Sequence, residues 1–373
     1  MRPLADAVVV ALHLRWRSVY QRPQHLLTRI ARHVPVIVLE EPLFASGPSR
    51  FDVDHPAPNL TVVRPVVDAD GPYLASRIAP GAVDFLRARL AEMGAGAPLL
   101  WLYTPMMLEL ADAFPSAPLI YDCMDDLSSF AFAPPGMRER ERTLLERADV
   151  VFCGGHSLYR ARAGHGPKVH CLPSGVEFAH FAAARTAAPH AAPALLRGRV
   201  YGYAGVIDER IDLEIVRALA ALPQSHVVLD GPVAKIDPRA LPSGPNVHYA
   251  GQVEYRELPR WIAGFDVALM PFALNASTRS ISPTKLLEYF AAGKPVVTTA
   301  VPDVIERYGD LVTVARTPQE FARACLHARQ SPQRDRAAAA AARAQSWDTI
   351  AAAMERMIGA ALVTLRIARE RAG

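Results

Sequence analysis

The sequence predicts an α/β protein made of two doubly wound domains. Short apolar runs alternate with amphipathic stretches along almost all of its 373 residues. Runs such as AVVVALHL and DVVFCG are typical of buried strands, and RPQHLLTRIARHV places Leu26, Leu27 and Ile30 on one face at helical spacing. This alternation implies parallel sheets covered by helices on both faces. The length suits two domains rather than one.

A change of composition marks the expected domain boundary. The stretch AAARTAAPHAAP carries two prolines and no large apolar residue, which indicates a linker. We therefore expect a first domain at residues 1–183, a linker at 184–194 and a second domain at 195–346. A C-terminal helix is expected at 347–373, where apolar residues form a stripe.

Charge and cysteine content exclude several classes of protein. The net charge of +4 suits phosphorylated ligands or an anionic surface, but it is too small for a typical nucleic-acid-binding protein. The four cysteines form no CxxC pair, which predicts a reducing cytoplasm and neither a disulfide framework nor a zinc site. No apolar run approaches the roughly 20 residues of a membrane-spanning helix. We expect a cytoplasmic protein, at most peripheral at the inner face of a membrane.

The segment SISPTKLLEYFAAGKPVVTT carries the most chemical information. Ser282 is a good N-cap, Pro283 suits the first helical position, and Lys285 follows within the first turn. A helix N-terminus with a nearby lysine favours a phosphate, and Glu288 shares a face with Lys285. A carboxylate at that place can accept both hydroxyls of a ribose. The alternative is an ordinary capped helix with a Lys285–Glu288 surface pair.

This segment resembles the donor-site motif of GT-B glycosyltransferases of the group 1 (family 4-like) type, through Glu288 and the run AAGKPVV. The resemblance is strongest over about the last two-fifths of the chain. YAGVIDERIDLEIV is similar to the family's glycine loop, with Gly205 in the loop and Arg210 at its basic position. VVLDGP, which contains Gly231, and FDVALMPF follow in the family's order. The resemblance implies that Ser282, Pro283, Thr284, Lys285 and Glu288 bind the donor together with these loops.

The resemblance also implies a fold and an activity. We expect two Rossmann-like domains facing across a cleft, with the C-terminal helix packing back on the first one. The expected activity is metal-independent transfer from a nucleotide sugar, a UDP-sugar, to a glycan or lipid-linked acceptor. No metal site and no cofactor other than this co-substrate is expected, and no nucleic acid.

One departure leaves the stereochemistry open. Many retaining members have a second glutamate eight positions earlier, and here that position is Ser280. The SPTKLLEY form is instead similar to the SxxKLLxY form in the family of the inverting glucuronosyltransferase of xanthan assembly.

A cluster of acids follows a predicted strand of the first domain, in YDCMDDLSSF. Asp122, Asp125 and Asp126 lie where ligands bind in open α/β sheets, and like charges there raise at least one pKa. By resemblance to the same inverting family, Asp125 is the candidate base that deprotonates the acceptor hydroxyl, with Asp126 beside it as a second catalytic candidate. The alternative is that Asp122 or Asp126 caps a turn and that all three are solvated.

The loop WRSVYQRPQH provides candidate acceptor-binding residues. In GT-B enzymes the equivalent loop borders the acceptor site, so Arg17, Arg22 and His25 are candidates for holding an anionic acceptor. The alternative is that Pro23 and His25 are routine first-turn residues of a helix. Asp68 and Asp70 form a DxD sequence in a Pro- and Gly-flanked loop, a context that disfavours a metal role.

Two rival functions use the same fold. A sugar-nucleotide epimerase would act on the donor alone, and a non-catalytic nucleotide-sugar-binding subunit would bind it without reaction. An epimerase would need several acids facing C2 of the donor sugar. The missing first glutamate favours the non-catalytic subunit, and the intact acid cluster argues against it. A transferase is the preferred interpretation.

Overall fold

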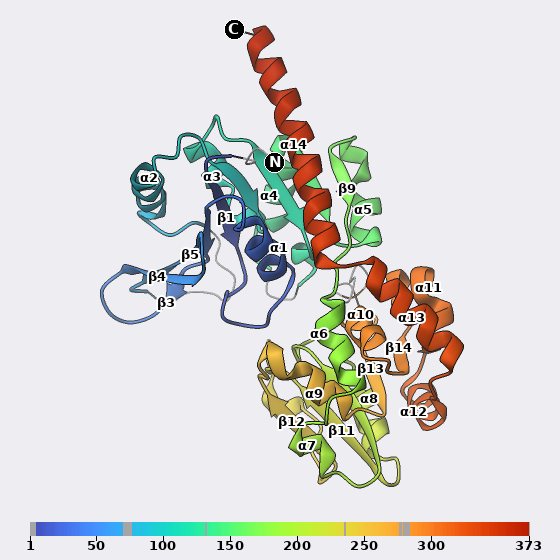
Figure 1. Ribbon diagram of the computed structural model, residues 1–373. Coiled ribbons are helices and arrows are strands. Elements are labelled where there is room, and N and C mark those ends of the chain that lie inside the picture. The colour runs from blue at the N-terminus through green and yellow to red at the C-terminus, as the bar shows by residue number, and fades with distance from the viewer. Residues whose placement is uncertain are drawn as a thin grey trace. The chain divides into compact units, whose positions relative to one another are not determined.

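The computed structural model describes residues 5–69, 77–130, 133–234, 236–275, 278 and 284–372. The chain divides into two compact units. Unit 1 comprises Met1–Pro173 and Asp348–Gly373, and unit 2 comprises Ser174–Trp347 (Figure 1). Each unit contains its own sheet, as the alternating sequence pattern predicts.

The sheet of unit 1 has the strand order β3-β5-β2-β1-β6-β7-β8-β9, and β4 pairs antiparallel with β5. The other neighbouring pairs are parallel. The central strands are buried from end to end, which explains why their sequences are unbroken apolar runs. The strands are β1 (Val8–Leu12), β2 (Val36–Glu40), β3 (Leu43–Phe44), β4 (Arg50–Ala57), β5 (Leu60–Val67), β6 (Leu99–Leu102), β7 (Leu119–Cys123), β8 (Val150–Cys153) and β9 (Val169–Cys171).

Helices flank this sheet, and the chain's last helix belongs to the same unit. The Arg29 guanidinium donates to the Asp348 carboxylate at 2.9 Å, which fastens the start of the last helix to the first one. The far end of the last helix extends beyond the rest of unit 1 (Figure 1). The helices are α1 (Arg22–Ile30), α2 (Ala82–Glu92), α3 (Glu109–Ala113), α4 (Met137–Arg147), α5 (His156–Arg162) and α14 (Trp347–Ala372).

The sheet of unit 2 is parallel, with the order β12-β11-β10-β13-β14-β15. This is the order of a Rossmann fold, in which the chain reverses its direction of travel across the sheet between β10 and β13. The strands are β10 (Arg199–Ala204), β11 (Ser225–Asp230), β12 (Val247–Gly251), β13 (Val267–Met270), β14 (Val296–Thr299) and β15 (Thr313–Ala315). The helices are α6 (Phe178–Ala182), α7 (Ala191–Ala194), α8 (Leu213–Ala220), α9 (Leu258–Ala263), α10 (Thr284–Ala291), α11 (Pro302–Tyr308), α12 (Pro318–His327) and α13 (Pro332–Ala344).

The segment expected to be a linker, residues 184–194, lies inside unit 2, whose first residue is Ser174. It contains the short helix α7 and is anchored by polar and ring contacts. Arg185 donates to the Ala291 carbonyl at 2.7 Å and pairs with Asp335 at 2.7 Å. The His190 ring stacks on Trp261 with centroids 4.4 Å apart. Such contacts leave no apolar periodicity in the sequence, which is why composition alone indicates a linker.

Candidate functional site

Two glycine loops meet at the carboxyl edge of the unit 2 sheet. Gly205 follows β10, and its N–H donates to the carbonyl of Asp230, the last residue of β11, at 2.8 Å. Gly231 has a φ of +154°, and a Cβ built on it would lie 1.9 Å from the Gly205 oxygen. The two loops therefore lie backbone against backbone, and a side chain at Gly231 is excluded. This edge, beside the switch between β10 and β13, is where open α/β sheets bind ligands.

The first described turn of α10 carries the two charged residues of the predicted donor motif. The Lys285 ammonium lies 3.2 Å from the Glu288 carboxylate, and the side chains are only 15% and 7% exposed. A pair this buried is not the solvated surface pair of the alternative interpretation. Thr284 begins the helix. Ser282 and Pro283 lie outside the described residues, so their capping roles stay predictions.

Arg210, the predicted phosphate-binding arginine, is held by a neighbouring acid. Its guanidinium makes a two-pronged contact with Asp208, with Nε–Oδ1 at 2.9 Å and Nη2–Oδ2 at 2.7 Å. Asp208 is 2% exposed, and the Arg210 side chain is 21% exposed. The Arg210 carbonyl accepts from the Ala273 N–H at 2.8 Å, which ties this loop to the segment after β13. The geometry pre-orients the guanidinium but partly neutralises its charge.

Asp230 is a residue of this edge that the sequence analysis did not single out. It is 1% exposed, and neither of its carboxylate oxygens has a hydrogen-bond partner in the described part of the chain. Burial raises its pKa to about 7, and the charge of Lys285 opposes that rise. The sequence does contain a signal for this residue. An acid stands directly before Gly-Pro at the end of the apolar run HVVL, and an acid is unusual at the end of a buried strand.

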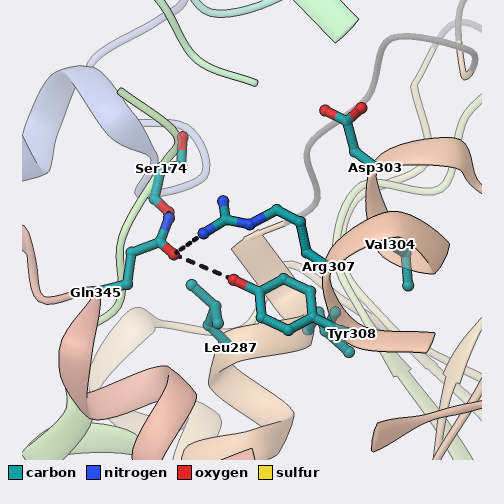
Figure 2. A pocket seen from close by; sticks show the side chains of 8 residues that line it. Ser174, Leu287, Asp303, Val304, Arg307, Tyr308 and Gln345 are labelled. Carbon is teal, nitrogen blue, oxygen red and sulfur yellow. Dashed lines mark hydrogen bonds between the residues drawn. The ribbon is translucent and has the colours of Figure 1, made fainter. Parts of the chain in front are cut away.

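A small cavity elsewhere in unit 2 is too confined to hold a nucleotide. Its volume is about 20 Å³, roughly the room for one water. Gln345 lines this cavity. Its side chain donates to the Ser174 carbonyl at 2.8 Å and accepts from Tyr308 at 3.1 Å and Arg307 at 3.4 Å (Figure 2). These bonds fasten the segment at Ser174 to α11, so we assign this cavity a structural role.

In unit 1, the first acid of the predicted cluster forms a buried ion pair. Asp122 lies at the end of β7 and is 0% exposed. The Arg22 guanidinium, which is 1% exposed, donates to Asp122 at 3.0 Å and to the Leu172 carbonyl at 2.8 Å. Burial raises the pKa of Asp122, and Arg22 opposes the rise; crowding by the other acids is not the cause. Asp122 is therefore not solvated, contrary to the alternative interpretation.

The other two acids of the cluster are partly exposed, but their surroundings differ. Asp126 accepts from the Ser129 hydroxyl at 2.7 Å and from the Ser128 hydroxyl at 3.0 Å, and Arg162 lies 3.5 Å away. It therefore anchors the turn at Leu127–Ser129, as the turn-capping alternative predicts for it. The Asp125 carbonyl accepts from the Cys123 thiol at 3.5 Å.

The three candidate acceptor-binding residues lie in different surroundings. Arg17 is exposed and pairs with Asp54 on β4 at 2.7 Å. His25 is 3% exposed, and its ring meets Tyr20 edge-on with centroids 4.6 Å apart. Arg22 is buried against Asp122, so its donors are directed into the interior. The structure therefore differs from the prediction for Arg22: it acts as an internal brace, because a guanidinium this deep needs a carboxylate partner.

Glu40 holds the loop that carries these candidates. It ends β2, is 0% exposed, and accepts from the Trp16 N–H at 2.6 Å. Arg64 donates to it at 2.7 Å, and Arg15 lies 3.4 Å away. The sequence analysis missed Glu40, since its partners are dispersed along the chain.

The described residues contain neither a metal-binding group nor a membrane-crossing helix. Across the described ranges, no group of three or more His, Cys, Asp or Glu side chains is placed to hold a metal ion. Asp68 is exposed, with a carboxylate oxygen 3.3 Å from the Gly47 N–H, and Asp70 lies outside the described residues. Within the described helices, none combines the length and apolarity needed to cross a bilayer.

Residues 209–331 match the family "Glycosyl transferases group 1". This part of the chain is similar to group 1 glycosyltransferases. This confirms the family that the sequence resemblance indicated, and the matched segment contains Arg210, Asp230, Lys285 and Glu288. A curated relative is the putative teichuronic acid biosynthesis glycosyltransferase TuaH of Bacillus subtilis, 28% identical over 225 residues. That match covers 54% of this chain and spans 55% of the length of TuaH.

Several solved structures share the fold of this chain. Sucrose-phosphate synthase from Thermosynechococcus elongatus matches with a TM-score of 0.70 at 17% identity, covering 96% of this chain and 100% of that one. Anabaena HepE, in complex with UDP and glucose, matches with a TM-score of 0.61 at 15% identity, covering 95% and 100%. The E. coli structure titled "Trehalose-6-phosphate", bound with UDP-2-fluoro glucose, gives 0.67 at 12% identity, covering 95% and 99%. The predicted GT-B fold class is thus confirmed.

Proposed function

We propose that this protein transfers a sugar from a nucleoside diphosphate sugar, a UDP-sugar, to a glycan or lipid-linked acceptor in bacterial-type polysaccharide synthesis. The observation that carries the proposal is the buried Lys285–Glu288 pair at the start of α10, inside the segment that matches the family. UDP is favoured because HepE and the E. coli structure are described with UDP or a UDP-sugar. A polysaccharide product is favoured by the description of TuaH.

Different residues of the donor site bind different parts of the nucleotide. Glu288 accepts the two ribose hydroxyls, and Lys285 places a positive charge beside the diphosphate. Arg210 and Thr284 add donors, and the helix start at Ser282 and Pro283 adds unpaired N–H groups. As the bond between the anomeric carbon and the diphosphate breaks, these groups stabilise the negative charge of the leaving group. The nucleotide sugar is a co-substrate, and no metal or other cofactor is proposed.

Unit 1 contributes the acceptor side of the reaction. The acceptor hydroxyl attacks the anomeric carbon and passes its proton to the Asp125 carboxylate. Asp126, held by Ser128 and Ser129, keeps the loop in place. Arg17 and His25 remain the candidates for holding an anionic acceptor, while Arg22 acts through Asp122.

The donor site is tested by calorimetric titration of UDP, with GDP and ADP as comparators. UDP binding that is lost in Glu288→Ala supports the site. Glu214→Ala is the matched control, because Glu214 forms a pair with Arg217 at the same helical spacing but is exposed. No nucleotide binding by folded wild-type protein would refute the proposal. Equal weakening by both variants would refute the role of Glu288.

The base is tested by Asp125→Asn with Asp126→Asn as its companion. Asp125→Asn is expected to bind UDP normally and to lose transfer from UDP-sugars to lipid-linked acceptors, by roughly 100-fold or more. Asp126→Asn removes an anchor of the turn, so a smaller loss together with a lower melting temperature is expected. Full transfer activity in Asp125→Asn would exclude Asp125 as the base. The same assay with donor alone detects an epimerase, and donor binding without any reaction indicates a non-catalytic subunit.

We further propose a cytoplasmic location with peripheral contact to an anionic membrane through the far end of α14. Val363 is 60% exposed and Ile367 is 45% exposed, and between them lies Arg366, which pairs with Glu370 at 2.9 Å. Sedimentation with phosphatidylglycerol vesicles tests this contact, with phosphatidylcholine vesicles as the control. Binding that falls at high salt and in Val363→Glu supports the contact, and its absence at low salt would remove it.

A further inference from the structure

Asp230 is a buried carboxylate that forms no hydrogen bond in the described part of the chain. It is 1% exposed, and both side-chain oxygens lack a partner among those residues, while its backbone carbonyl is used by the Gly205 N–H. Leaving an ionised carboxylate in such a place is costly, so a neutral form or an incoming partner is needed. The residue lies at the carboxyl edge of the sheet, where the proposed donor site lies.

Among the described residues, the positive charge recorded as acting on the Asp230 carboxylate is that of Lys285. The residues beside it on the adjacent strands, Ala204 on β10 and Gly251 on β12, are uncharged. From α10, Lys285 acts on Asp230 as a cation, and the Tyr289 hydroxyl accepts from the Ala204 N–H at 2.8 Å. Asp230 contributes to the raised pKa of Tyr289, so that phenol stays neutral. The ionised state of Asp230 therefore depends on Lys285.

The Lys285 ammonium interacts with Glu288 as well as with Asp230. It lies 3.2 Å from Glu288, so one ammonium serves two buried carboxylates. A nucleoside diphosphate at this edge brings at least two further negative charges and competes for the same ammonium. The charged form of Asp230 then loses part of its stabilisation and gains a repulsive neighbour, and both changes favour protonation.

We propose that Asp230 takes up a proton when a nucleoside diphosphate binds, so that donor affinity decreases as the pH rises above neutrality. Asp230 is a positioning residue in this scheme: as a neutral acid it leaves Lys285 to the diphosphate. The inference rests on the proposed function, since it requires the donor to bind at this edge.

The direction of the pH effect follows from linkage. Burial brings the pKa of Asp230 to about 7 in the free protein, so the group titrates in an accessible range. Binding of the diphosphate raises that pKa further. At pH values between the pKa of the free protein and that of the complex, the complex therefore binds more protons than the free protein. Affinity is greatest below pH 7 and falls by up to about tenfold per pH unit above it, until the pKa of the complex is reached.

Calorimetric titration of UDP at pH 8 in two buffers of different ionisation enthalpy, such as HEPES and Tris, counts the protons. The β-phosphate of UDP titrates near pH 6 and is ionised at pH 8, so a proton taken up from the buffer at pH 8 binds to the protein. Asp230→Asn is the matched variant, with the same size and no titration. We expect the wild type to take up about half a proton or more per UDP and Asp230→Asn close to none.

The affinity profile provides a second readout. Between pH 6.5 and 8.5, wild-type affinity is expected to fall more steeply than that of Asp230→Asn, which binds UDP at least as tightly at pH 8.5. Equal proton counts in folded wild type and variant would overturn the inference, as would loss of UDP binding in folded Asp230→Asn. If Asp230→Asn does not fold, the wild-type count at pH 8 decides, and a count of zero overturns it. Failure of the wild type to bind any nucleotide would instead refute the proposed function.

Discussion

Replacing Asp230 by asparagine should change how the stability of unit 2 depends on pH, with no ligand present. The ordinary pKa of an aspartate is 3.8, whereas burial raises that of Asp230 to about 7. The folded protein therefore binds this proton more tightly than the unfolded chain does. The contribution of Asp230 to the free energy of unfolding is therefore fully present below pH 3.8. It decreases as the pH rises from 3.8 to 7, and it stays constant above pH 7.

The magnitude follows from the size of the shift. A displacement of about 3 pKa units at about 1.4 kcal/mol per unit amounts to roughly 4 kcal/mol of stability lost by pH 7. Between pH 5 and pH 7 the loss is about 2 kcal/mol, because the carboxyl is half ionised at pH 7. Asparagine does not titrate, so the stability of Asp230→Asn relative to wild type should rise by about that amount across this interval. The buried amide adds a cost of about 1–3 kcal/mol that is independent of pH and shifts the whole curve.

Scanning calorimetry of the full chain from pH 5 to pH 8 measures this effect as the difference in stability between variant and wild type. All other titrating groups are the same in the two proteins, so their contributions cancel in that difference. Asp237→Asn is the control: Asp237 is partly exposed beside Arg239, which lowers its pKa, so its contribution is level over this range. A constant difference between Asp230→Asn and wild type from pH 5 to pH 7 would refute the reasoning. It would show that Asp230 is paired or solvated in the folded protein.

Three other substitutions or reactions test the structure. Gly231→Ala should prevent the close packing of the two loops, because Gly231 has a φ of +154° and a Cβ there would lie 1.9 Å from the Gly205 oxygen. The affinity for UDP and the melting temperature should both fall. An unchanged melting temperature would contradict this. Asp122→Ala leaves Arg22 buried without its carboxylate and should cost roughly 3–5 kcal/mol in chemical denaturation, with partial recovery when Arg22→Met is added. Burial raises the pKa of the Cys153 thiol to about 12, so the native protein should leave it unmodified by iodoacetamide at pH 8, and stoichiometric labelling without unfolding would contradict its burial.

Much of the fold could be predicted because burial on both faces leaves continuous apolar runs. β1 and β6 are recognisable for that reason, and α8 and α10 by their helical spacing. β4 escaped prediction: its sequence RFDVDHPA is exposed at the sheet edge and shows little apolar alternation. Residues 184–194 were predicted as a linker because Arg185 and His190 act through polar and stacking contacts, which carry no periodicity.

The sequence by itself determined the α/β class and placed Lys285 and Glu288 on one helix face, because both depend on the spacing of residues within strands and helices. The family was indicated by the resemblance of the donor motif. The tertiary structure alone decided that Arg22 braces Asp122, 100 residues away, instead of facing a ligand. It also decided that Asp126 anchors its turn and that Asp230 is enclosed with no hydrogen-bond partner among the described residues. The reason is physical: local spacing sets which face of an element a residue occupies. Burial and charge pairing depend on which distant segments cover that face, and these set the protonation state and role of each acid.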